Sequence, residues 1–171
     1  MRYFAASLAL SGALALSVAA QAEPLAPKSL QRLAWNLDGA SWEVDKDGAS
    51  DKGQPEVSVF HKNAGIMVSL QENNSAATVD AHWQEYVKAT RAVSRVFNEV
   101  SVPSELKPPA GFSCRAEESS LGDDPPNKTR VLCGAVQGKT LALLSLTLPK
   151  EEWRPHLQDL NAMLKGISWR N

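Results

Sequence analysis

The stretch KTLALLSLTL, residues 139–148, is the most apolar of the predicted strands. It follows a turn at Gln137-Gly138, and leucines point to both faces of the extended chain. A strand that is apolar on both faces needs cover on both faces. We therefore expect this strand at the centre of a sheet, with the other elements arranged around it.

Two antiparallel strands are predicted just before this stretch, over residues 110–117 and 129–136. The polar loop over 118–128 joins them, and Cys114 and Cys133 lie symmetrically about its centre. Pairing of the two strands would place these cysteines opposite each other. They are the only two cysteines of the chain. An even number of cysteines in an exported chain predicts a disulfide, whereas zinc or redox chemistry is disfavoured because no Cys-x-x-Cys motif is present.

Apolar spacing predicts the elements further from the central strand. Alternation over 56–62 and 66–71, with a turn between them, indicates a hairpin. Spacings of three and four residues predict a long amphipathic helix over 78–97. A second amphipathic helix is predicted from 149 to 169, with Pro155 at the first position of its main part.

Weaker patterns complete the chain. We predict a short helix over 29–35, a strand over 41–46 followed by a turn at Asp47-Gly48, and a proline-rich connector over 103–109. Residues 23–171 are therefore expected to form a single α+β domain, an antiparallel sheet flanked by helices and closed by one disulfide.

The first 22 residues are typical of a secretory signal peptide. Arg2 supplies a basic start, an apolar stretch follows, and Ala20-Gln21-Ala22 fits a signal-peptidase site, so we predict cleavage before Glu23. A membrane anchor is the alternative, but the stretch is short and contains Ser and Gly. The mature chain is expected to be periplasmic or secreted, without a stable membrane anchor.

The order of the predicted elements resembles the α/β/α sandwich of PsbP-like and DcrB-like proteins. The shared pattern runs from about Trp42 to Trp169 and includes Gly111 before the strand that follows the long helix, and Trp153 ahead of Pro155. The resemblance implies an α/β/α sandwich and a non-enzymatic binding, assembly or envelope role, as in most known members. It implies no active-site residue.

Composition and motifs argue against several functions. The formal net charge of −1 is untypical of a nucleic-acid surface. A Gly-x-Ser-x-Gly elbow and a phosphate-binding loop are both absent from the sequence. Asp80 and His82 could offer metal ligands, but without His-x-x-x-His a histidine at the solvent edge is the simpler interpretation. We therefore predict no enzyme activity, cofactor or metal, although an unrecognised hydrolase whose groups meet only in space stays an alternative.

Two features are candidate binding surfaces. The loop that contains Asp123, Asp124, Pro125 and Pro126 is acidic and is expected to protrude, and protrusions of this kind often carry contacts. A solvated hairpin tip is the alternative for this loop. Trp35 and Trp42, near the start of the mature chain, could form an exposed aromatic face, although packing of all five tryptophans in the core is the alternative.

The sequence thus predicts an exported, periplasmic, non-catalytic protein that binds a protein partner or a ligand in the cell envelope. The partner is expected to be an envelope or secreted protein. The alternative is a periplasmic immunity protein that neutralises a secreted antibacterial toxin, with the acidic loop entering the active site of the toxin.

Overall fold

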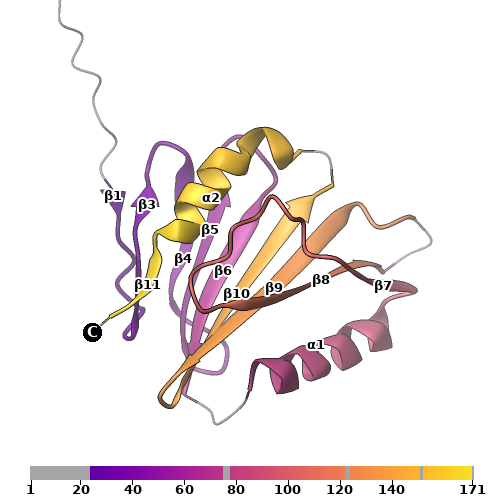
Figure 1. Cartoon of the computed structure of the whole chain (residues 1–171), viewed down its shortest axis with the longest axis horizontal. Helices are drawn as coiled ribbons and strands as arrows, with labels where there is room; N and C mark the ends of the chain where they lie inside the picture. The colour runs from indigo at the N-terminus through magenta and orange to yellow at the C-terminus, as the bar shows by residue number, and fades with distance from the viewer. Residues whose placement is uncertain (1–23, 75–77, 122–123, 151, 171) are drawn as a thin grey trace, which may run out of the picture.

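The computed structural model describes residues 24–74, 78–121, 124–150 and 152–170. Its main element is a seven-stranded antiparallel sheet in the order β4-β5-β6-β10-β9-β8-β7 (Figure 1). The strands of this sheet are β4 (Trp42–Ala49), β5 (Pro55–His61), β6 (Met67–Asn73), β7 (Val96–Val100), β8 (Ser113–Ser120), β9 (Lys128–Gln137) and β10 (Thr140–Pro149). The helices are α1 (Val79–Val93), the 3-10 turn η1 (Arg154–His156) and α2 (Leu157–Lys165). Short strand pairs join β1 (Pro24–Leu25) to β3 (Leu37–Asp38), and β2 (Leu33–Trp35) to β11 (Ile167–Trp169).

The central position of the leucine-rich strand is confirmed. β10 lies between β6 and β9, and Leu144 is opposite both Leu70 and Cys133. Leu144, Leu146 and Leu148 are at most 1% exposed. The burial of this strand supplies much of the apolar area that stabilises the domain.

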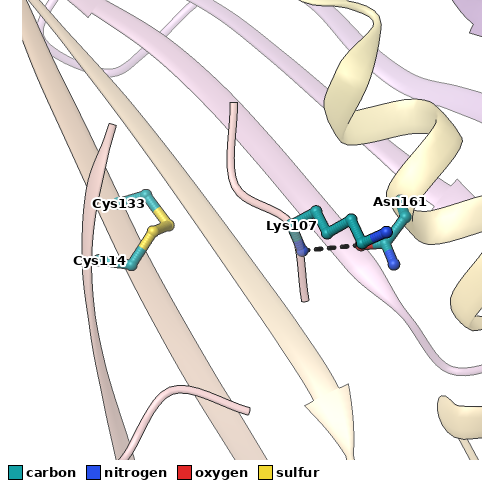
Figure 2. Close-up of a disulfide and its surroundings, with 4 residues drawn as sticks. All are labelled: Lys107, Cys114, Cys133 and Asn161. Atoms are coloured by element: carbon teal, nitrogen blue, oxygen red, sulfur yellow. Dashed lines mark hydrogen bonds between the residues drawn. A yellow bond between two sulfur atoms is a disulfide. The ribbon is translucent and has the colours of Figure 1, made fainter. Parts of the chain in front are cut away.

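One face of the sheet holds the main core. α2 and the connector over 101–112 cross this face (Figure 1), and Leu160, Leu164 and Leu106 pack into the core from them. A hydrogen bond joins the connector to α2: the Lys107 backbone N–H donates to Asn161 Oδ1 at 2.9 Å (Figure 2). The disulfide between β8 and β9 lies on the same side, and its cysteines are direct cross-strand partners, as predicted.

The opposite face is only partly covered. Helix α1 begins after Thr78, whose side chain accepts a hydrogen bond from the Ala81 N–H, and its buried residues are Trp83 and Val87. It packs mainly on β7, β8 and β9, at one end of the sheet (Figure 1). Among the described residues, no helix lies over the outer surface of β4, β5 and β6, and Met67 on this surface is 52% exposed.

Several predicted boundaries were wrong. The long helix ends at Val93 rather than at residue 97, because β7 leaves the helix to pair with β8. The last residues, Ile167–Trp169, form strand β11 rather than the end of a helix. Gly166 allows this change, since a Cβ at this position would overlap the Asn36 carbonyl oxygen. The Asp47-Gly48 pair lies inside β4 rather than in a turn.

The segment over 29–35 is an extended strap rather than a short helix. Its last residues, Leu33–Trp35, pair with β11. Before that point, the N–H groups of Gln31, Arg32 and Leu33 donate to the carboxylate of Glu72 at 2.7–3.0 Å. These long-range bonds outweigh the weak local preference for a helix.

Candidate functional site

A groove between α1 and the open half of the sheet is the best candidate site. Its inner part is a cavity of about 100 Å³ with apolar walls that include Val79, Trp83, Leu132 and Leu143. Its outer part is a wider polar compartment of about 600 Å³. Glu56, Gln71 and His82 line both parts. An apolar pocket with a few polar groups at its mouth is the usual form of a binding site.

The groove exists because of the sheet register. Gln71 and Leu143 are neighbours on β6 and β10, and Gly134 follows on β9. A Cβ at Gly134 would lie 2.9 Å from the methyl groups of Val79, so the glycine lets the start of α1 approach β9 closely. Beyond β9 the helix no longer covers the sheet, and the gap beside Trp83 stays open.

Ion pairs set the electrostatics of the groove. Lys46 Nζ lies 2.7 Å from Glu56 Oε2, and this hydrogen bond raises the pKa of the lysine. Across the groove, Arg115 lies 2.7 Å from Asp80. These charges are paired in the free protein, so a bound group gains little by offering one isolated charge. The walls therefore favour an apolar or neutral polar group.

His82 lines both the apolar and the polar part of the groove. Burial lowers the pKa of this half-buried imidazole, although the charge of Glu85 acts in the opposite direction. The ring is therefore neutral at pH 7 and can both donate and accept a hydrogen bond.

Replacement of His82 by glutamine should flatten the pH dependence of stability. Below the ordinary pKa of 6.5, the unfolded chain binds a proton that the folded chain resists. Wild-type stability should therefore fall as the pH drops below 6.5, and His82→Gln should lose that part of the slope. Urea midpoints at pH 7.5 and pH 5.5 measure the difference. If the urea midpoints of the two proteins changed equally between pH 7.5 and pH 5.5, the lowered pKa of His82 would be contradicted.

A buried polar network fixes α1 to the sheet. Glu117 on β8 is completely buried, and its Oε1 accepts from the Tyr86 hydroxyl at 2.6 Å and from Arg130 at 3.3 Å. Burial and this hydrogen bond both raise the pKa of Tyr86. Partial burial lowers the pKa of the Arg130 guanidinium, but its contacts with Tyr86 and Glu117 outweigh this effect and raise the pKa overall. With both pKa values raised, the Tyr86 hydroxyl stays neutral and the Arg130 guanidinium stays charged at neutral pH.

The change Tyr86→Phe should destabilise the protein by about 2 kcal/mol, because it removes a hydrogen bond to a buried carboxylate. Ser119→Ala is the matched control, since the Ser119 hydroxyl contacts the same Glu117 oxygen over 3.3 Å. We expect a smaller loss for that variant. Equal urea unfolding curves for the two variants would show that the Tyr86 hydroxyl has no special role.

The predicted binding loop lies at the other end of α1. Asp124 and Pro125 are exposed and Pro126 is half-buried, whereas Asp123 lies outside the described residues. A cavity of about 760 Å³ separates this loop from α1. Leu121 and Val93 line it and are 74% and 65% exposed.

The prediction of an exposed aromatic face is corrected by the structure. Trp35 and Trp42 are each 1% exposed and belong to the core. Trp35 lies on β2, which pairs with β11, and the ring of Trp42 contacts His61 edge to face. The position of these tryptophans in the sequence gave no sign of this, because β2 pairs with β11, which is distant in sequence.

A cluster missed by sequence reasoning brings together His61, His156 and Asp159. One ligand atom from each lies within 4.8 Å of the others. His61 Nε2 is 3.3 Å from Asp159 Oδ2, and the two imidazole rings lie 4.4 Å apart. The spacing of His156 and Asp159 at the start of a helix was the available signal. In contrast, Asp80 is paired with Arg115 and His82 lies at the groove.

Comparison with solved structures agrees with this architecture. The solution structure of cyanobacterial PsbP (CyanoP) from Synechocystis sp. PCC 6803 superposes with a TM-score of 0.56 at 12% identity. The match covers 95% of this chain and 99% of that chain. The fold is therefore PsbP-like, as the order of elements predicted. No protein-family model and no curated protein sequence matches the chain.

The length and apolar character of the described helices bear on whether one of them could cross a membrane. Among residues 24–74, 78–121, 124–150 and 152–170, no helix is long and apolar enough to cross a membrane.

Proposed function

We propose that this chain is an exported, non-catalytic binding protein of the cell envelope, and that the groove beside α1 receives an apolar side chain of a partner protein. The observation that carries the proposal is the apolar cavity of about 100 Å³ that opens into a polar groove. A volume of this order suits one side chain better than a large cofactor. Pockets that bury one anchor residue are typical of the centre of protein interfaces.

The sheet surface next to the groove supports a protein partner. Phe60 and Met67 are cross-strand neighbours on the uncovered face, and Met67 is one of the exposed large hydrophobic residues. Ser58 and Ser69 form the next pair and lead to the groove. An apolar centre with a polar border is the usual composition of an interface.

Two features support export. Residues 1–22 have the order of a signal peptide but lie outside the described residues, and the Cys114–Cys133 disulfide suits an oxidising compartment. The proposed location is therefore the periplasm or the exterior of the cell.

Site-specific photo-cross-linking in the native envelope tests the proposal. A photoreactive amino acid at Lys52 or Met67 should cross-link one protein, whereas the same probe at Gln158, on α2 at the opposite face, should not. Ser69→Phe, which fills the inner cavity, should abolish the adduct, while Ser168→Phe, at an exposed position of β11, should leave it. Failure to obtain an adduct above the Gln158 control would overturn a protein partner at this groove.

The immunity function is a second proposal, and one observation favours it. Exposed Leu121 and Val93 flank the cavity beside the acidic loop, so this end of the molecule could also bury an apolar contact. A photoreactive probe at Asp124 separates the two proposals. A toxin adduct at Asp124, with none at Lys52 or Met67, would support the immunity protein and contradict the groove.

A further inference from the structure

We propose that His61, His156 and Asp159 form a binding site for a divalent transition metal of the zinc class, separate from the groove. Two imidazoles and one carboxylate are a common ligand set for such ions. The site lies on the α2 side of the sheet, so the proposal goes beyond the binding function and does not depend on it.

The first ligand is held rigidly. His61 is the last residue of β5, its side chain is 1% exposed, and the ring is fixed by an edge contact with Trp42 at 5.1 Å between centroids. The backbone N–H of Asn63 donates to Nδ1 at 3.3 Å. Nε2 is therefore the nitrogen that points to the cluster, as its contact with Asp159 shows.

The other two ligands come from one turn of helix. His156 ends η1 and Asp159 follows three residues later in α2, so both side chains lie on the same face. The His156 ring is tilted by 50° against His61. In the described part of the chain, the imidazole of His156 makes no hydrogen bond. A purely structural role explains the His61–Asp159 contact but leaves the second imidazole unexplained.

The distances between the three ligand atoms would suit a metal ion after a small decrease. Ligands about 2.1 Å from a tetrahedral zinc ion lie about 3.4 Å from each other. The three ligand atoms are already within 4.8 Å, and the His61–Asp159 pair is at 3.3 Å. A rotation of the His156 and Asp159 side chains, which are not fully buried, can supply the difference.

The cluster is open on one side. Asp159 lines a cavity of about 300 Å³ together with Asn36, Asp38 and Ser41. Its side chain is 43% exposed, so an ion can enter from solvent. Three protein ligands leave a fourth position for water or for a donor atom from a partner.

Metal binding requires a change of tautomer at His61. In the free protein His61 carries its proton on Nε2, because Nδ1 accepts from Asn63. Metal binding at Nε2 requires the proton to move to Nδ1, and the exposed Asn63 N–H then bonds to water.

Zinc titration of the tag-free mature chain, stripped with a chelator, tests the proposal. Calorimetry with ZnCl₂ at pH 7.5 should show one equivalent bound, and metal analysis after dialysis should agree. His156→Gln and Asp159→Asn should each weaken binding at least tenfold. His82→Gln is the control and should bind like wild type.

Two results would overturn the site. One is the absence of zinc binding by the wild type. The other is equal zinc affinity in wild type, His156→Gln and Asp159→Asn, which would place the ion elsewhere. His61 is left unchanged because its burial makes a folding defect the expected effect of substitution. Cross-linking at the groove is independent of these results, so the two proposals fail separately.

Discussion

Replacement of Glu72 by alanine should lower the free energy of unfolding by about 3 kcal/mol. Glu72 is the last but one residue of β6, is 2% exposed, and lies on the face covered by α2 and the N-terminal strap. Its Oε1 accepts from the N–H groups of Arg32 and Leu33 at 2.8 and 2.7 Å, and its Oε2 accepts from Gln31 at 3.0 Å. Three consecutive backbone donors thus form a concave site for one carboxylate.

The expected loss of stability is large because the three backbone N–H groups cannot all bond to water once the carboxylate is removed. Leu33 is fully buried, so its N–H would be left without an acceptor in the alanine variant. A buried donor without a partner costs about 1–3 kcal/mol, and the weaker hold on Gln31 and Arg32 adds to it. The strap should then separate from β6 before the sheet unfolds, and hydrogen exchange at residues 31–35 should rise.

Two variants make this prediction specific. Glu72→Gln keeps one acceptor oxygen but turns an NH₂ group toward a backbone donor, so its stability should lie between those of the wild type and Glu72→Ala. Glu43→Ala removes an exposed carboxylate from β4 and should change stability by less than about 0.5 kcal/mol. Urea unfolding followed by tryptophan fluorescence measures all three. Equal midpoints for Glu72→Ala and Glu43→Ala would contradict the role of the buried carboxylate.

The sheet was predictable because its signals are local. Alternation and turn residues mark the hairpin of β5 and β6, and the run of leucines marks β10. Cross-strand pairing of Cys114 and Cys133 followed from their symmetry about one loop. Each of these features lies within a segment whose two strands are neighbours in sequence and in space.

The strap was missed because distant residues determine its structure. Leu30 and Leu33 have helical spacing, yet Leu33 pairs with Trp169 and its N–H bonds to Glu72. The buried tryptophans follow from the same arrangement, since Trp35 is opposite Ile167. No local pattern indicates that β2 and β11, which lie far apart in sequence, pair with each other.

The candidate sites were missed for the same reason. His61 and Asp159 are 98 residues apart in sequence, and only the packing of α2 on the sheet brings them together. The groove depends on which strands α1 leaves uncovered, and this follows from strand order rather than from the helix itself. The sequence predicted His82 as a histidine at the solvent edge, but it did not predict the cavity that His82 lines.

Removal of the disulfide should cost about 3 kcal/mol, the amount expected when a loop of about 20 residues is released in the unfolded chain. Cys114 and Cys133 are direct partners on β8 and β9, and their bond closes the hairpin whose loop includes Asp124. β8 is bound on its other side only by β7, the last strand of the sheet. The effect should therefore include greater local opening at this edge.

Two ways of removing the disulfide distinguish the effect of the cross-link from the effect of side-chain packing. Chemical reduction of the wild type keeps both sulfur atoms in place, whereas Cys114→Ala with Cys133→Ala also removes a thiol from a site that is 4% exposed. The reduced wild type should lose about 3 kcal/mol in urea unfolding, and the double variant slightly more because of the added cavity. A reduced protein as stable as the oxidised one would show that the sheet holds this edge without the bond. With the predicted loss, a chain kept in a reducing compartment would be much less stable than the exported form, and this difference links the fold to the proposed location outside the cytosol.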